Sequence, residues 1–155
     1  MKAEQLFSVL SVSPEDTENA GKKVAEIISG YTVTGDYPTV ALYGDLGAGK
    51  TCFVRGMADV LTPGAPVKSP TYTVVNEYPG NPSLFHFDMY RIESEDDLES
   101  IGFYDYPEDA IFVVEWSEKI PFALPDDYYR VTILKTDEEE RRRITIEHIT
   151  VEDEA

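Results

Sequence analysis

The segment LYGDLGAGKT, residues 42–51, decides how the rest of the chain is interpreted. From Gly44 to Thr51 it reads G-x-x-x-x-G-K-T, which is the full pattern of a phosphate-binding P-loop. The apolar run at 39–43 predicts a buried strand before the loop, and residues 50–61 predict a helix after it. A P-loop requires this order of strand, loop and helix. The segment therefore predicts a site for a nucleoside triphosphate.

The chemistry of such a loop gives each part a role. Its glycines let backbone N–H groups approach phosphate oxygens, and the start of the following helix adds partial positive charge. Lys50 is expected to reach the β- and γ-phosphates, and the Thr51 hydroxyl suits Mg²⁺. Asp45 is either a surface turn residue or a carboxylate near the γ-phosphate. The predicted nucleotide contacts are Asp45, Leu46, Gly47, Ala48, Gly49, Lys50, Thr51 and Cys52.

A carboxylate at the end of a second buried strand could complete the site. Residues 111–115 are four apolar residues followed by Glu115, which is the form of a Walker-B strand. Ligands of open α/β sheets bind at the carboxyl ends of the strands. Glu115 is therefore predicted to bind Mg²⁺ directly or to hold one of the ligands of the metal.

A third strand supplies another candidate. Along residues 85–91 apolar and polar side chains alternate, which would place His86, Asp88 and Tyr90 on one face. Asp88 could then hold a water of the metal or orient the attacking water. We interpret His86 as a packed, hydrogen-bonded core histidine. Cys52, in the predicted helix, is interpreted as a small buried residue, because nothing in the sequence supplies an activating environment for its thiol.

The remaining pattern alternates helices and strands early and is rich in strands late. A capped helix should begin at Ser13, and a hairpin should span residues 71–90. Further elements are expected as a helix at 93–101 and a terminal hairpin of strands at 128–134 and 142–150. This order predicts an α/β, P-loop NTPase-like three-layer fold, with a mixed parallel and antiparallel sheet flanked by helices.

Composition narrows the class of protein. The chain has 155 residues, a net charge of −17 and a single cysteine. The length predicts one domain, residues 1–155. The acidic charge argues against gripping nucleic acid alone, because phosphate binding requires a basic surface. We expect a cytoplasmic protein, because one cysteine allows no internal disulfide and we find neither a membrane-spanning run nor a secretory signal.

Four segments together resemble the TsaE (YjeE) family, small bacterial ATPases of the tRNA threonylcarbamoyladenosine pathway. They read GDLGAGKT from Gly44, SPTYTVVNEY from Ser69, HFDMYR from His86 and VVEWSEKI…LPDD from Val113. The segments occur in the family's order and at its spacing, and the similarity covers about residues 15–133. The P-loop alone would be generic, whereas the set of four is specific.

The resemblance implies an activity and partners. Members of the family bind and slowly hydrolyse ATP with Mg²⁺. They reset the complex of the TsaB and TsaD subunits between turnovers, and TsaD performs the transfer to adenosine in tRNA. The chain would then reach tRNA only through that complex.

The resemblance also implies roles for single residues. Lys50 would contact the phosphates, and Thr51 with Glu115 would hold Mg²⁺. Asp88 would be a functional carboxylate near the γ-phosphate, so that Lys50, Asp88 and Glu115 form the catalytic set. Thr71 would lie in a switch-like loop, and Trp116 would be important to activity.

One departure from the family bears on affinity. Cys52 stands where the family usually has a threonine, and a thiol donates a weaker hydrogen bond than a hydroxyl. Nucleotide affinity would be lower for that reason. Two other classes stay open: a small P-loop kinase that passes the γ-phosphate to a metabolite, and a nucleotide-binding regulator that does not hydrolyse.

Overall fold

The computed structural model describes residues 1–31, 37–44, 49–71, 73–107, 109–138 and 141–151. Its strands are β1 (Lys2–Ser11), β2 (Thr39–Tyr43), β3 (Val75–Tyr78), β4 (Leu84–Asp88), β5 (Ile111–Glu115), β6 (Tyr128–Lys135) and β7 (Arg142–Thr150). Its α-helices are α1 (Pro14–Ser29), α2 (Lys50–Leu61) and α3 (Glu95–Ser100). Short 3₁₀ helices are η1 (Phe103–Asp105), η2 (Ser117–Lys119) and η3 (Pro121–Ala123).

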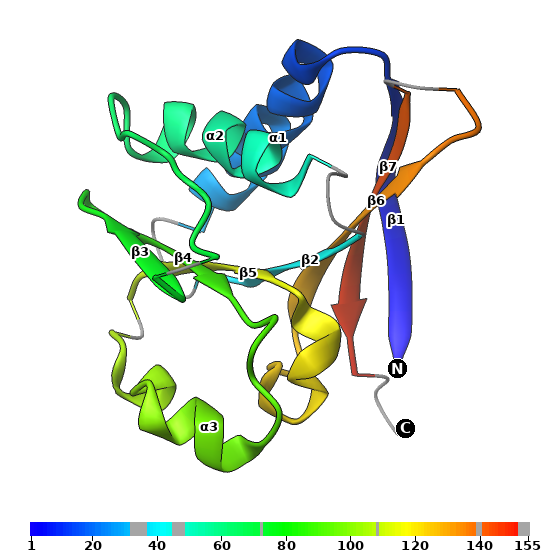
Figure 1. The fold of residues 1–155 in the computed structure, drawn as a ribbon. Coiled ribbons are helices and arrows are strands. Elements are labelled where there is room, and N and C mark those ends of the chain that lie inside the picture. The colour runs from blue at the N-terminus through cyan, green and yellow to red at the C-terminus, as the bar shows by residue number, and fades with distance from the viewer. Residues whose placement is uncertain (32–36, 45–48, 72, 108, 139–140, 152–155) are drawn as a thin grey trace.

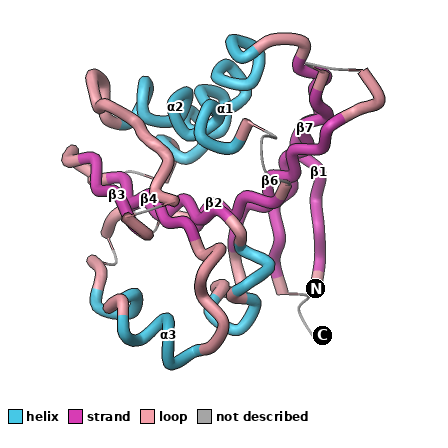
Figure 2. The backbone as a smooth tube through the Cα atoms, in the orientation of Figure 1, coloured by secondary structure: helices cyan, strands magenta, loops and turns pink. Residues whose placement is uncertain are grey.

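In the described residues the strands form one sheet in the order β1-β7-β6-β2-β5-β4-β3. The central strand β2 pairs in parallel with β5 and β6, and β5 pairs in parallel with β4. The outer pairs β3–β4, β6–β7 and β1–β7 are antiparallel. Figures 1 and 2 show α1 and α2 together on one face of the sheet and α3 on the other. The predicted three-layer α/β fold with a mixed sheet is therefore confirmed.

Helix α1 begins as the sequence predicts. The Ser13 side chain caps it by accepting a hydrogen bond from the Asp16 N–H at 3.2 Å, and Pro14 occupies the first turn. Helix α2 packs directly on α1, because glycines let the two backbones approach. A Cβ added to Gly56 would lie 1.9 Å from the Glu18 carbonyl oxygen, so no larger residue fits there. This contact fixes the helix that carries Lys50.

Two hydrophobic clusters hold the layers together. The larger cluster lies between the sheet and α1 and α2, and it includes Val24, Val40, Phe53 and Val113. The other lies on the α3 face and is built on Phe85, Phe87, Met89, Leu98 and Val114. The predicted alternation of β4 is thus confirmed, since Phe85, Phe87 and Met89 share the α3 face. Within the described residues, no helix is long and apolar enough to cross a bilayer.

Two segments differ from the expectation. The chain begins with strand β1, which pairs along the sheet edge with β7 and which the sequence pattern did not indicate. The strand expected from residue 71 begins only at Val75. The cause is Val74, whose φ of 69° is left-handed and breaks the strand conformation. Its N–H donates to the Pro70 carbonyl at 2.7 Å, which closes a turn before β3.

Candidate functional site

Helix α2 brings Lys50 to the carboxyl end of β2. Gly49 occupies the N-cap with a φ of 106°, which favours glycine, and it has no side chain to cap the first N–H groups of the helix. The Lys50 ammonium donates to the Gly44 carbonyl at 2.8 Å and lies 3.9 Å from the centroid of the Trp116 ring. Asp45, Leu46, Gly47 and Ala48, which were predicted to contact the nucleotide, lie outside the described residues.

Three adjacent parallel strands deliver the other groups to the same edge of the sheet. Strand β5 lies between β2 and β4, and Glu115 is the register partner of both Leu42 and Asp88. Because the strands run in parallel, their carboxyl ends meet beside the start of α2. Lys50, Asp88 and Glu115 are buried, with only 5%, 6% and 4% of their surface exposed. Buried charges of both signs are thus gathered in one place.

Glu115 is bonded to a histidine of the neighbouring strand. His86 Nε2 is hydrogen-bonded to Glu115 Oε2, and His86 is fully buried. The interpretation of His86 as a packed, hydrogen-bonded core residue is confirmed. The alternation along residues 85–91 places His86 on the face of Asp88, but the sequence pattern did not reveal its bond to Glu115.

Asp88 is held by the loop that precedes β3. The Thr71 hydroxyl donates to Asp88 Oδ2 at 3.2 Å, and the Ser69 and Thr71 hydroxyls are 2.7 Å apart. The Tyr90 N–H donates to Asp88 Oδ1 at 2.9 Å. Both oxygens of the Asp88 carboxylate therefore have donors, and Thr71 links the loop to the carboxylate.

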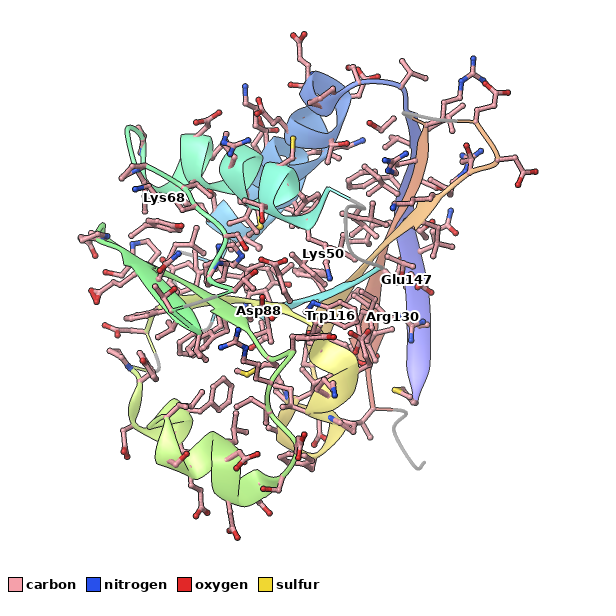
Figure 3. All side chains as sticks on the ribbon, viewed as in Figure 1. Lys50, Lys68, Asp88, Trp116, Arg130 and Glu147 are labelled. Carbon is pink, nitrogen blue, oxygen red and sulfur yellow. The ribbon has the colours of Figure 1, made fainter. Side chains whose placement is uncertain are left out.

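A cavity of about 450 Å³ joins these groups. It is lined by Gly49, Lys50, Thr51, Cys52, Ser69, Thr71, Asp88, Tyr90, Glu115 and Trp116. In Figure 3, Asp88 and Trp116 lie below Lys50 at the start of α2. Arg130 and Glu147 form an ion pair between β6 and β7 and are not among the described residues that line the cavity. A larger cavity of about 600 Å³ is lined by residues 62–66, 68 and 75–79, and none of these groups lines it.

Every described residue of the predicted site lines the 450 Å³ cavity. Sequence reasoning had not assigned Ser69 a contact, and it had placed Tyr90 only on the face of Asp88. Both line the cavity as well. Ser69 could have been found from its place two residues before Thr71, within the same loop segment.

Trp116 forms one wall of the cavity. It directly follows Glu115 and has a left-handed φ of 59°, which is unusual for a bulky residue. Its ring lies 5.0 Å from the Tyr90 ring, and the Lys50 ammonium faces it. The turn after β5 thus directs the ring across the cavity rather than along the strand.

Cys52 differs from its expectation, because it is half-buried and not part of the core. Its Sγ donates to the Pro14 carbonyl at 3.1 Å, at the start of α1. Burial raises the pKa of the Cys52 thiol, and the nearby charge of Glu18 raises it further. The group is therefore a neutral thiol at pH 7 and a weak donor.

The donors at the cavity suit Mg²⁺ better than a softer metal. Among the described residues, no group of three or more His, Cys, Asp or Glu side chains could hold a metal ion. The protein's share of a metal site here would be the Thr51 hydroxyl and the Glu115 carboxylate. Mg²⁺ prefers hard oxygen ligands, keeps several waters and accepts phosphate oxygens. Two ligands from the protein are therefore sufficient.

Comparison with known proteins identifies relatives across nearly the whole chain. The profile of the family described as "Threonylcarbamoyl adenosine biosynthesis protein TsaE" matches residues 11–144. The protein named "tRNA threonylcarbamoyladenosine biosynthesis protein TsaE" in Haemophilus influenzae is 44% identical over 118 residues, covering 70% of this chain and 74% of that one. The protein of the same name in Nostoc is 36% identical over 160 residues, covering 99% and 94%.

A solved structure shows the same architecture. The crystal structure of YdiB from Bacillus subtilis superposes with a TM-score of 0.68 at 26% sequence identity. The match covers 96% of this chain and 88% of that one. The arrangement of the layers and the sheet is therefore shared along almost the full length.

Proposed function

The chain belongs to the TsaE family of tRNA threonylcarbamoyladenosine biosynthesis proteins, and from this premise we propose that it binds ATP with Mg²⁺ and hydrolyses it slowly. The hydrolysis would reset the TsaB–TsaD complex between rounds of tRNA modification. One observation carries the proposal. Lys50, Thr51, Asp88 and Glu115 come from distant parts of the sequence and line one cavity at the carboxyl ends of adjacent parallel strands.

The start of α2 is suited to hold the phosphates. Its first backbone N–H groups carry partial positive charge, and Gly49 leaves them without a side-chain cap. Lys50 already points at the loop, where it donates to the Gly44 carbonyl. On nucleotide binding we expect phosphate oxygens to replace that carbonyl and the Trp116 ring as its partners, because a charge-assisted bond is stronger.

The two buried carboxylates divide the remaining tasks. Thr51 and Glu115 would hold Mg²⁺, which when bound neutralises charge on the phosphates. Asp88 would order the attacking water, and the Thr71 hydroxyl at 3.2 Å keeps that carboxylate oriented. The bond from Thr71 to Asp88 also connects the loop at 68–71 to the reaction centre, as a switch requires.

The acidic surface supports a role through partners. With a net charge of −17, the chain would be repelled by tRNA phosphates if it approached them unaided. We propose that TsaB and TsaD carry the tRNA and that this chain contacts only those subunits. A role in tRNA modification would also place the protein in the cytoplasm.

The structure favours water over a metabolite as the acceptor. Kinases of this size cover the phosphates with arginines from a lid. No arginine is among the described residues that line the 450 Å³ cavity. A small P-loop kinase is therefore the weaker candidate, whereas the non-hydrolysing regulator is separated only by experiment.

One experiment separates the three functions. Phosphate release from Mg·ATP is measured with and without purified TsaB–TsaD, and labelled ATP is offered with a panel of small-molecule acceptors. We expect slow release that TsaB–TsaD accelerates. Label transfer to an acceptor would establish the kinase instead, and tight binding without release in either condition would establish the regulator.

A further inference from the structure

His86, the buried histidine of β4, has no role in the proposed hydrolysis, although it is hydrogen-bonded to the proposed metal ligand Glu115. We propose that His86 is a positioning residue that fixes the Glu115 carboxylate for Mg²⁺. This inference rests on the proposed function, since it assigns Glu115 to the metal. His86 itself does not line the cavity and would touch neither nucleotide nor metal.

The strand register brings the two side chains together. In the parallel pairing of β4 with β5, Asp88 is opposite Glu115 and His86 is opposite Val113. His86 and Asp88 are two residues apart, so both side chains are on the face of Glu115. His86 Nε2 can therefore reach Glu115 Oε2 from behind the cavity.

The direction of this bond follows from its surroundings. As a ligand of Mg²⁺ the Glu115 carboxylate would be ionised and could only accept, so the imidazole would donate from Nε2. His86 Nδ1 has no hydrogen-bond partner among the described residues. The tautomer with its proton on Nε2 therefore avoids a buried N–H group without an acceptor, which would be costly.

The bond restricts the one part of Glu115 that the sheet leaves free. The Glu115 backbone is paired on both sides, with Leu42 and with Asp88. The last torsion of a glutamate side chain is broad, so the carboxylate would otherwise rotate. A donor at Oε2 holds the carboxylate plane and keeps it ready for the metal. Partners behind a metal ligand commonly change affinity or activity by about 10- to 100-fold.

Two substitutions of similar size isolate the donor at Nε2. In His86→Gln the amide nitrogen can occupy the place of Nε2 and donate to Glu115. In His86→Asn the amide ends at the place of Nδ1 and cannot reach. Nucleotide affinity is measured in EDTA, and the Mg²⁺ concentration for half-maximal phosphate release is measured for each variant.

We expect His86→Asn to raise the half-saturating Mg²⁺ concentration by about 10- to 100-fold while nucleotide affinity in EDTA stays at the wild-type value. His86→Gln should recover most of that loss. The double variant H86N/E115Q should be no worse than E115Q, because His86 acts only through Glu115. Phe85→Leu, on the opposite face of β4, controls for a general loss of packing and should leave the Mg²⁺ dependence unchanged.

Three outcomes would overturn the positioning role. They are a wild-type Mg²⁺ dependence in H86N, equal defects in H86N and H86Q, or loss of nucleotide binding by H86N in EDTA. The last two would indicate that His86 supports the fold and not the orientation of Glu115. Failure of the proposed function looks different, because the wild-type chain itself would then show no Mg²⁺-dependent release.

Discussion

The two faces of strands β4 and β5 are built from alternate residues of the same segments, yet they differ in charge and in the kind of side chain they carry. On the side of α1 and α2, β4 presents His86 and Asp88 beside Glu115 of β5. On the side of α3, the same strands present Phe85, Phe87 and Phe112. One face gathers buried charge and the other gathers aromatic rings.

The aromatic face is a continuous set of edge-to-face contacts. The Phe87 ring lies 5.1 Å from Phe103, 5.1 Å from Tyr106 and 5.8 Å from Phe112, centroid to centroid. Phe85 adds a contact to Tyr106 at 5.0 Å. Such pairs stabilise beyond the burial of their area, by about 0.5–1.5 kcal/mol each. The aromatic face therefore stabilises β4 and β5, the strands that carry the polar groups.

The polar face lowers the stability of the fold. Burial of a carboxylate is unfavourable unless donors replace its water, and here Thr71 and the Tyr90 N–H supply Asp88 while His86 supplies Glu115. Because side chains alternate between the two faces, one strand can carry stability on one face and chemistry on the other. Changes on the aromatic face should then lower stability, and changes on the polar face should lower turnover.

The largest effect is expected from Phe87→Ala. Phe87 is fully buried at the centre of the aromatic face, and its loss leaves a cavity that the rigid sheet cannot close. We expect the free energy of unfolding in urea to fall by about 3–5 kcal/mol. Tyr104→Ala is the control, because Tyr104 is exposed and should cost little. A Phe87 variant with wild-type stability would show that the aromatic face does not support the strands.

Lys50→Ala should have nearly as large an effect, but on turnover. Removal of one positioned cationic donor typically costs about 10²–10³-fold in rate. Phosphate release per molecule should fall by that factor, with the urea midpoint close to the wild-type value. Lys22→Ala is matched in charge and removes only an exposed pair with Asp59 at 3.9 Å. Full ATPase activity in the Lys50 variant would remove the P-loop lysine from the mechanism.

Glu115→Ala tests turnover and stability at one residue. We expect Mg²⁺-dependent turnover to fall by about 10²-fold, whereas nucleotide binding in EDTA should persist. Stability should fall by only about 1–3 kcal/mol, because the His86 N–H loses its acceptor. Glu147→Ala is the control, since that carboxylate pairs with Arg130 at 3.0 Å and is not among the described residues that line the cavity. Normal turnover without Glu115 would exclude it from the metal site.

Local pattern was sufficient to predict most of this arrangement. The P-loop, the acid at the end of β5 and the alternation of β4 are short-range features, and each has a period or spacing set by backbone geometry. From them the sequence predicted Lys50 at the phosphates and Glu115 at the carboxyl end of its strand, and the resemblance to the TsaE family implied that Asp88 lies near the γ-phosphate. The structure places all three residues along one cavity.

The features that escaped prediction depend on distant partners or on strain. Strand β1 is defined by its pairing with β7, from Lys2 opposite Thr150 onward, and its own residues are mostly exposed. The left-handed Val74 delays the start of β3 to Val75, although valine ordinarily favours a strand. The bond between His86 and Glu115 needs the parallel register of two strands. None of these relations is encoded in a local spacing.

The smallest predicted effect lies at the edge of the polar face, on α2. Replacing Cys52 by threonine exchanges a weak thiol donor for a hydroxyl beside the nucleotide site. If the hydroxyl donates to a phosphate oxygen, a bond worth about 1 kcal/mol should tighten ATP binding roughly fivefold in calorimetry. Cys52→Ala cannot donate and should bind no more tightly than the wild type. An unchanged affinity in the threonine variant would mean that the hydroxyl keeps the thiol's present acceptor, the Pro14 carbonyl, and that position 52 stabilises the contact between α1 and α2 without touching the nucleotide.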